Sequence, residues 1–155
     1  QQTKTKAMKA IHNTDEKRRI EKFSFGLLGK NTWTNASSLN YAFSGLIGVW
    51  FSDHSFDGWN YHHEYEINSE NYLELENNEE LIDIINGFLI ERGFDPYSPQ
   101  DYDVWDEAET ERIINQYREL AEEFREKIGV EVIVLKNDLE FGGKSFIVFN
   151  TNCIR

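Results

Sequence analysis

Residues 48–61 read GVWFSDHSFDGWNY, a short apolar run followed by a turn-rich segment crowded with aromatic side chains. The apolar run at 47–52 predicts a short buried β-strand, because almost no polar group interrupts it. The second half, which holds Trp59, Asn60 and Tyr61, is expected to lie on an exposed, turn-rich segment. Two explanations account for so many aromatic side chains: a packed core, or a slot that receives a flat aromatic ligand.

Apolar runs on both sides of this stretch predict further strands. The runs VEVIVL at 130–135 and FIVF at 146–149 are too continuously apolar for an exposed sheet, so both strands are expected to be buried. A shorter run at 7–11 predicts a first strand. Residues 65–76 alternate apolar and polar side chains around an Asn-Ser break, which is typical of two strands joined by a turn.

Two amphipathic helices are predicted in the central part of the chain, each with apolar residues recurring every three or four positions. In the first helix these residues are Leu81, Ile85 and Phe88. In the second helix, which covers about 107–127, they are Ile113, Tyr117, Leu120 and Phe124. The first helix is expected to end at Gly93, and the second at Gly129 as its C-terminal cap.

The strands and helices together predict an α+β fold in a single domain over 1–155. The polar segment at 29–40 and the segment at 94–103, which holds both prolines, are predicted loops. The central helical section is acidic, and its outer face over 101–126 is expected to be solvated surface.

The composition limits the classes of partner. The chain has 155 residues, enough for one domain with a hydrophobic core, and a formal net charge of −12. Proteins that bind nucleic acid need a basic face, so this charge argues against a nucleic-acid partner. Two partner classes remain: a small ligand held in a local pocket, or a basic protein attracted by the acidic surface.

The chain has one cysteine, Cys153, so an internal disulfide is excluded and a reducing, cytoplasmic compartment is expected. No apolar run approaches the roughly 20 residues that span a bilayer, so no membrane partner is expected. No secretory signal pattern opens the chain. The first residue is Gln1 rather than Met, which fits either an excised part of a longer polypeptide or a trimmed chain.

Four short motifs occur along the chain in a recognisable order. They are IHNT at 11–14, GVWFSD at 48–53, Tyr61 eleven residues after Trp50, and KSFIVFN at 144–150 with Ile154 close behind. This set resembles the ADP-ribosyltransferase fold, in its His-Tyr-Glu branch of poly(ADP-ribose) polymerases and diphtheria-type toxins. Within that branch it is most similar to transferase-like domains of phage and mobile-element polyvalent proteins. The section at 62–128, with the two helices, matches no family motif.

The resemblance implies a split β-sheet core, NAD as substrate, and transfer of ADP-ribose to a macromolecule, a protein rather than a nucleic acid. A phage or bacterial effector, such as a toxin, is the expected role. In the family the first-strand histidine bonds a ribose hydroxyl and the next backbone positions hold the nicotinamide carboxamide, which implies these roles for His12, Asn13 and Thr14. Trp50 and Tyr61 would stack on the nicotinamide across a gap one ring wide, next to Phe51 and Ser52.

The sequence departs from the family pattern at three positions. Asn13 replaces a glycine, and Trp50 replaces a tyrosine but keeps a flat stacking face. At the third position, Ser145 stands where the family has its catalytic glutamate. A serine supplies no negative charge, and losing one preorganised electrostatic contact costs about 2.7–4 kcal/mol in the transition state. The predicted catalytic residues are therefore Ser145 and Glu140, with Asp138 as a further carboxylate before the strand.

Several alternatives stay open. The protein could be an acidic inhibitor or immunity factor that docks on a basic partner, or an inactive binder of NAD or ADP-ribose. His12 could be a structural histidine and Trp50 a core residue. His62 and His63 are adjacent in a strand and would point to opposite faces, so no shared metal ion is expected there. Cys153 has no base beside it in the sequence and is interpreted as structural.

Overall fold

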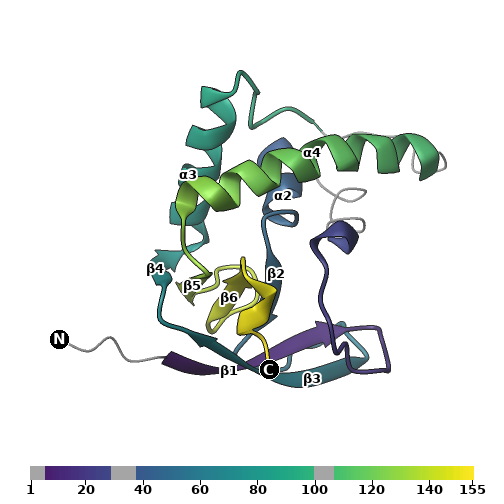
Figure 1. The fold of residues 1–155 in the computed structure, drawn as a ribbon, viewed down its shortest axis with the longest axis vertical. Helices are drawn as coiled ribbons and strands as arrows, with labels where there is room; N and C mark the ends of the chain where they lie inside the picture. The colour runs from purple at the N-terminus through teal and green to yellow at the C-terminus, as the bar shows by residue number, and fades with distance from the viewer. Residues whose placement is uncertain (1–5, 29–37, 100–106) are drawn as a thin grey trace. The chain divides into compact units, whose positions relative to one another are not determined.

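The structure, a computed structural model, describes residues 6–28, 38–99 and 107–155 (Figure 1). They form an α+β protein in which strands and helices are segregated into two units. The sheet unit comprises 1–23, 49–78 and 130–155, and the helical unit comprises 24–48 and 79–129. The fold class is thus confirmed as α+β, whereas the single-domain assignment stays a prediction.

Six strands form one mixed sheet in the order β3-β1-β2-β6-β5-β4. They are β1 (Lys6–Thr14), β2 (Val49–Ser52), β3 (Tyr61–Ser69), β4 (Tyr72–Asn77), β5 (Val132–Asn137) and β6 (Ser145–Val148). β4 and β5 are parallel, and the other neighbouring strands are antiparallel. Each predicted strand region therefore contains a strand. Tyr61 differs from its expectation, because it pairs with Thr14 and begins β3 instead of lying in the preceding turn.

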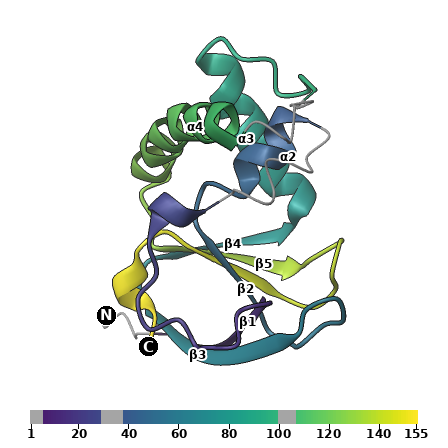
Figure 2. The ribbon, with the colours of Figure 1, turned by 90° about the vertical axis from the view of Figure 1, so that its right-hand side faces the viewer.

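The sheet is strongly coiled. Only Glu70 and Asn71 separate β3 from β4, although these two strands lie at opposite edges of the sheet. A link of this length spans no more than about 11 Å, so the two edges approach each other there. Figure 2 shows the pair β1 and β3 passing beneath β2 and β5.

The inner face of this coiled sheet holds the apolar core of the unit. Pairing and alternation place a continuous set of buried side chains on this face. They are Met8, Ala10, Val49, Phe51, Tyr65, Ile67, Val132, Val134, Phe146 and Val148. On β5 and β6 the other face is buried too, at Ile133, Leu135 and Ile147. This two-sided burial explains why these two strands are apolar without alternation.

The helical unit contains α2 (Leu39–Ser44), α3 (Asn78–Glu91) and α4 (Glu107–Ile128). The first residue of α3, Asn78, is the last residue of the preceding segment of the sheet unit. Its core is centred on Phe43, Phe88 and Phe124, whose ring centroids lie 5.1–5.9 Å apart. α3 and α4 were both expected from their apolar spacing. The short helix α2 was not expected, because it begins within the polar segment at 29–40, whose residues 29–37 lie outside the described chain.

The apolar face of α4 is rotated from its predicted position. Its buried apolar side chains are Ile114, Ala121 and Phe124, and the polar Thr110 is buried as well. The other predicted residues of the face, Ile113, Tyr117 and Leu120, are only half-buried. Ala121 was not included in the predicted apolar face, because its side chain is too small to stand out in the hydrophobic pattern. Gly129 follows α4 with φ +71°, the left-handed conformation that glycine adopts without strain, as its prediction as a C-terminal cap requires.

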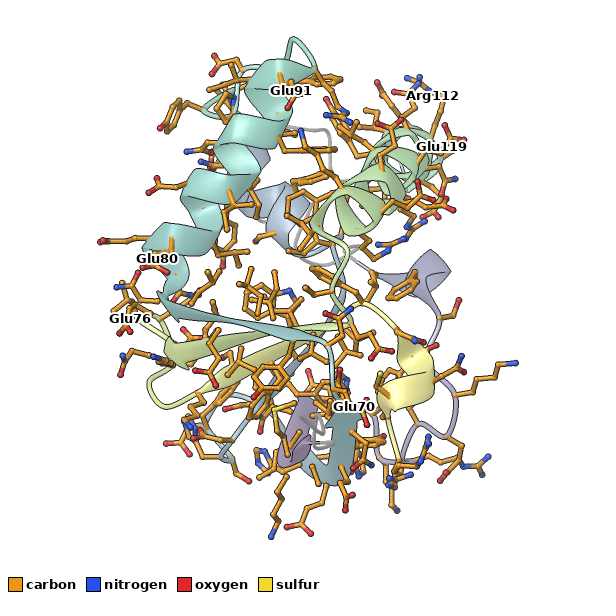
Figure 3. All side chains as sticks on the ribbon, turned by 60° about the vertical axis from the view of Figure 1, so that its left-hand side comes forward. Glu70, Glu76, Glu80, Glu91, Arg112 and Glu119 are labelled. Atoms are coloured by element: carbon orange, nitrogen blue, oxygen red, sulfur yellow. The ribbon has the colours of Figure 1, made fainter. Side chains whose placement is uncertain are left out.

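Carboxylates cover much of the outer surface of both units. Figure 3 shows labelled glutamates pointing away from the ribbon, among them Glu76, Glu80, Glu91 and Glu119. All four are exposed, and Glu119 lies within the predicted acidic face at 101–126. In the described part of that face, Glu109, Glu122, Glu123 and Glu126 are exposed as well, as predicted. Every helix in the described part of the chain is too short or too polar to span a bilayer.

Candidate functional site

The three motif segments that lie far apart in the sequence form neighbouring strands. β1 carries the motif at 11–14, β2 the motif at 48–53, and β6 the motif at 144–150. β2 lies between the other two and pairs with both. Residues from the two ends of the chain therefore meet at the centre of the sheet.

The strand register divides the predicted site residues between two faces of the sheet. Directly opposed residues of antiparallel strands share a face, and successive residues of one strand alternate. Ser52 is opposed to both Ile11 and Ser145, whereas Thr14 is opposed to Tyr61. One face, here called the Trp50 face, carries Asn13, Trp50, Ser52 and Ser145. The other, here called the His12 face, carries His12, Thr14, Phe51 and Tyr61.

The expected slot between Trp50 and Tyr61 is not formed. Ile11 and Thr14 are an odd number of positions apart in β1, so they lie on opposite faces of the sheet. Ile11 is opposed to Ser52, which shares its face with Trp50, whereas Thr14 is opposed to Tyr61. The indole and the phenol consequently have the sheet between them. The prediction that these two side chains face each other across one ring-wide gap, beneath His12, is wrong.

The space beside His12 is filled by the protein's own aromatic side chains. The imidazole centroid lies 5.4 Å from that of Phe23, 5.5 Å from Phe51 and 6.5 Å from Tyr65. Its Nδ1 lies 3.3 Å from the carbonyl oxygen of Trp50, to which it donates a hydrogen bond in the matching tautomer. On this face the packed-core explanation of the aromatic cluster holds, and His12 acts as a tie between β1 and β2.

Burial lowers the pKa of His12 below the ordinary value of 6.5, and the nearby His63 lowers it further, against the opposing effect of the backbone hydrogen bond. In the unfolded chain the imidazole takes up a proton near 6.5, whereas in the folded protein it resists protonation. As pH falls below about 6.5, the unfolded state therefore binds more protons and the free energy of unfolding decreases. Urea unfolding between about pH 8 and pH 5 measures this decrease.

The variant His12→Gln is the control for this pH dependence. Its amide can still donate to the carbonyl of Trp50 but does not titrate, so the variant should lose stability less steeply on acidification. Titratable groups remote from His12 are the same in both proteins and cancel in the comparison. An equal loss of stability in the two proteins would mean that His12 is not buried in its neutral form.

The Trp50 face holds a carboxyl group next to Ser145, the residue that the resemblance aligns with a catalytic glutamate. Ser145 Oγ donates a hydrogen bond of 2.5 Å to Asp138 Oδ2, and both residues are only 4% exposed. The carboxyl group that contacts Ser145 is therefore that of Asp138, which precedes β6 by a tight turn. Glu140 lies in that turn with an exposed side chain.

Asp138 also organises the turn at 138–143. Its Oδ1 accepts hydrogen bonds from the backbone N–H of Glu140 at 2.9 Å and of Phe141 at 3.1 Å. The side-chain amide of Asn78 donates to the same oxygen at 3.3 Å. Both carboxylate oxygens are thus in use, one toward the turn and one toward Ser145. This division makes the position of the second oxygen well defined.

Two histidines that the motif comparison passed over lie on or beside this face. His54 Nδ1 lies 2.8 Å from Asp53 Oδ1 and 3.1 Å from Ser52 Oγ. Asn13 donates from Nδ2 to the carbonyl of His54 at 3.3 Å, and its Oδ1 lies 2.5 Å from Nδ1 of His62. Nothing in the spacing of these residues indicates the cluster, because it depends on the pairing of β1, β2 and β3.

His62 and His63 point to opposite faces, as predicted. His62 contacts Asn13, whereas His63 Nε2 lies 2.8 Å from the carbonyl oxygen of Glu16. Within the described residues, no group of three potential ligands could hold a metal ion. Cys153 is buried, and burial together with Glu131 raises the pKa of its thiol to about 11, so it remains protonated at neutral pH. This agrees with a structural role.

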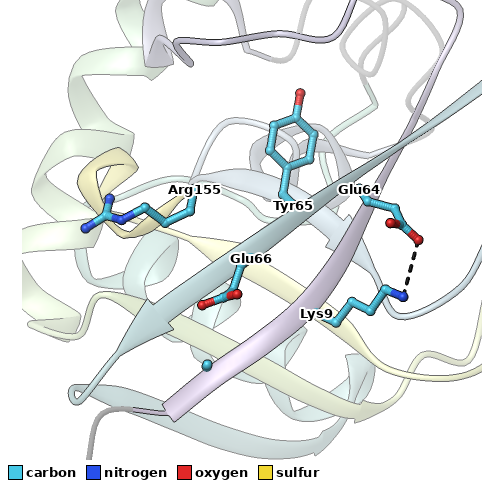
Figure 4. Close-up of a pocket in the computed structure, with 6 residues that line it drawn as sticks. Lys9, Glu64, Tyr65, Glu66 and Arg155 are labelled. Atoms are coloured by element: carbon cyan, nitrogen blue, oxygen red, sulfur yellow. Dashed lines mark ion pairs between the residues drawn. The ribbon is translucent and has the colours of Figure 1, made fainter.

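A separate depression lies on the outer side of β1 and β3 (Figure 4). It has a volume of about 440 Å³ and is lined by Ala7, Lys9, Glu64, Tyr65, Glu66 and Arg155. Lys9 and Glu64 form an ion pair of 3.3 Å at largely exposed side chains. The depression includes none of the predicted site residues, and its charges are mixed, so it indicates no ligand class.

No protein-family model, curated protein or solved structure matches the chain. The chemistry available on the Trp50 face is therefore the basis for a functional assignment. This face combines an indole, two serine hydroxyls, an amide and a buried carboxylate. Such groups can stack on a planar ring, bond sugar hydroxyls and stabilise a positive charge.

Proposed function

We propose that the protein binds NAD on the Trp50 face, breaks the bond between nicotinamide and ribose, and transfers ADP-ribose to a protein acceptor. This proposal includes the ADP-ribosyltransferase-like fold, with a cytoplasmic phage or bacterial effector as the setting. One observation supports it above all: the separate motifs form adjacent strands, and a buried carboxylate contacts the serine at the family's glutamate position.

Each group on the Trp50 face has a place in this reaction. The indole of Trp50 offers the flat surface that orients the nicotinamide ring. As the glycosidic bond breaks, positive charge develops on the ribose, and the charge of Asp138 stabilises it through the Ser145 hydroxyl. His12 contributes indirectly, because its hydrogen bond to the Trp50 carbonyl holds β2 in place.

Thermal unfolding with and without NAD tests the binding step. A ligand that binds only the folded state stabilises it by about 2.7 kcal/mol at one hundred times its dissociation constant, so NAD should raise the melting temperature. Trp50→Ala should abolish this rise because the stacking surface is lost. Tyr61→Ala should keep it, since Tyr61 lies on the opposite face of the sheet.

Each variant is compared with its own melting temperature in the absence of NAD, which removes the effect of the substitution on folding. Release of nicotinamide from NAD, measured by chromatography, then tests the cleavage step. The proposal is overturned if NAD at millimolar concentration neither stabilises the wild-type protein nor loses nicotinamide.

Capture of a basic protein is the second candidate function. The observation that favours it is the net charge of −12 together with the exposed carboxylates of α4. Those carboxylates are Glu109, Glu119, Glu122, Glu123 and Glu126. Association of this kind weakens steeply with ionic strength. Capture of a basic protein would be favoured over NAD cleavage by two results together. A bound protein partner dissociates at moderate salt, and NAD neither raises the melting temperature nor is cleaved.

A further inference from the structure

His54 and Asp53 form a carboxylate–imidazole pair immediately after β2. Asp53 Oδ1 lies 2.8 Å from His54 Nδ1, and the side chains are 36% and 38% exposed. An ionised carboxylate can only accept hydrogen bonds, so the proton of the neutral imidazole belongs on Nδ1. Nε2 then carries the lone pair. Within the described residues, Nε2 has no hydrogen-bond partner.

A glycine in the neighbouring turn leaves room for the Asp53–His54 pair. Gly143 approaches it so closely that a Cβ atom at this position would lie 2.4 Å from Asp53 Oδ1 and 2.8 Å from His54 Nδ1. Its φ of +64° also disfavours any other residue. The backbone N–H of Asp53 donates to the carbonyl of Lys144 at 3.0 Å, which ties the pair to the start of β6.

Aromatic packing holds one side of the imidazole. The centroid of His54 lies 5.6 Å from that of Phe56, which in turn stacks on Phe141 at 4.6 Å with a 10° interplanar angle. Phe141 belongs to the turn that Asp138 organises. The imidazole is therefore fixed by a hydrogen bond, by aromatic packing and by the same turn that orients the carboxylate at Ser145.

We propose that His54 is the general base that activates the acceptor, and that the acceptor group is a hydroxyl. This inference rests on the proposed function. A hydroxyl is a weak nucleophile until its proton is removed, and an imidazole held by a carboxylate is suited to remove it. Acceptor carboxylates would need no base, because they are already ionised at neutral pH.

Atoms and charge are conserved in the transfer step. The acceptor oxygen bonds to the ribosyl carbon that carried nicotinamide, and the bond from that carbon to the nicotinamide nitrogen breaks. The bonding electron pair leaves with nicotinamide, which neutralises the pyridinium charge of NAD. The hydroxyl proton passes to His54 Nε2, where Asp53 stabilises the imidazolium, and is then released to solvent. No oxidant or reductant takes part.

Hydrolysis of NAD, in which water is the hydroxyl acceptor, provides the assay. His54→Gln should release nicotinamide at least about a hundredfold more slowly than the wild-type protein. Sodium azide should restore the rate in this variant and yield ADP-ribosyl azide, because the azide anion has no proton to lose. His63→Gln is the matched control, since His63 lies on the other face and contacts the carbonyl of Glu16.

The outcomes separate this inference from the function on which it rests. A slow His54→Gln variant that azide restores supports His54 as the base. Hydrolysis by His54→Gln at the wild-type rate overturns the role of His54 and leaves the proposed function intact. A slow variant that still gains a melting-temperature rise with NAD but does not respond to azide also overturns it. A wild-type protein that neither binds nor cleaves NAD removes both.

Discussion

Asp138→Asn is expected to slow the release of nicotinamide from NAD by about one hundred- to one thousandfold, the usual effect of losing one preorganised electrostatic contact. The substitution keeps the shape of the side chain and removes its negative charge. Its Oδ1 can still accept the backbone hydrogen bonds of Glu140 and Phe141, so the turn should persist. Initial rates of nicotinamide release at saturating NAD measure the effect.

Glu140→Gln is the matched control, because it removes a charge from the same turn. The sequence alone favoured Glu140 as the substitute carboxylate, whereas the structure puts Asp138 in contact with Ser145. We therefore expect Glu140→Gln to keep the wild-type rate. If Glu140→Gln releases nicotinamide much more slowly than the wild-type protein and Asp138→Asn does not, the catalytic carboxylate is Glu140 rather than Asp138.

A double variant that moves the carboxylate from position 138 to position 145 tests whether the location of the negative charge matters. The double variant Asp138→Ser with Ser145→Glu moves the carboxylate onto the strand, to the position that the resembling family uses. A rate above that of Asp138→Ser alone would mean that a carboxylate at either position serves the same ribosyl cation. A folded double variant that is no faster than the single variant would contradict this equivalence.

Phe124→Ala is expected to lower the free energy of unfolding by about 3–5 kcal/mol, the largest effect on stability that we predict. Phe124 is fully buried in the helical unit, with edge-to-face contacts to Phe43 at 5.9 Å and to Phe88 at 5.1 Å. Alanine would remove the ring and leave a cavity between two aromatic neighbours. Urea unfolding at constant pH measures the change.

Ile90→Ala is the control for this substitution. Ile90 belongs to α3 of the same unit but is 60% exposed, and alanine favours helix formation. Substitutions at such surface positions usually change stability by no more than about 0.5 kcal/mol. A small effect of Phe124→Ala, similar to that of Ile90→Ala, would show that the helical unit does not depend on this aromatic core.

The corrected positions of the aromatic residues change the interpretation of the motif set. His12 belongs to the packed inner face of the sheet, and Tyr61, which is half-buried, lies at the end of the same face. The indole of Trp50 and the carboxyl group that contacts Ser145 belong to the Trp50 face, and His54 lies beside Ser52 of that face. The motif segments thus lie on strands that pair with one another, whereas the side chains that they single out are divided between the two faces of the sheet.

Local patterns in the sequence were sufficient to locate the strands and the two long helices. The apolar runs of β5 and β6, the spacing of α3 and the glycine after α4 are properties of neighbouring residues, so they can be recognised without long-range contacts. The short helix α2 and the rotation of α4 were missed. α2 lies in a polar stretch, and the buried Ala121 is too small to mark a face.

The composition of the site depended on contacts that no local pattern contains. Whether Trp50 and Tyr61 share a face follows from the register of β1 with its two neighbours, and a shift of one residue would reverse the answer. The contact of Asp138 with Ser145 likewise follows from the turn that returns the chain into β6. The periodicity of a strand shows only that its successive side chains point to opposite faces. Which face is buried, and which side chains of other strands lie beside it, depends on pairing with residues distant in the sequence.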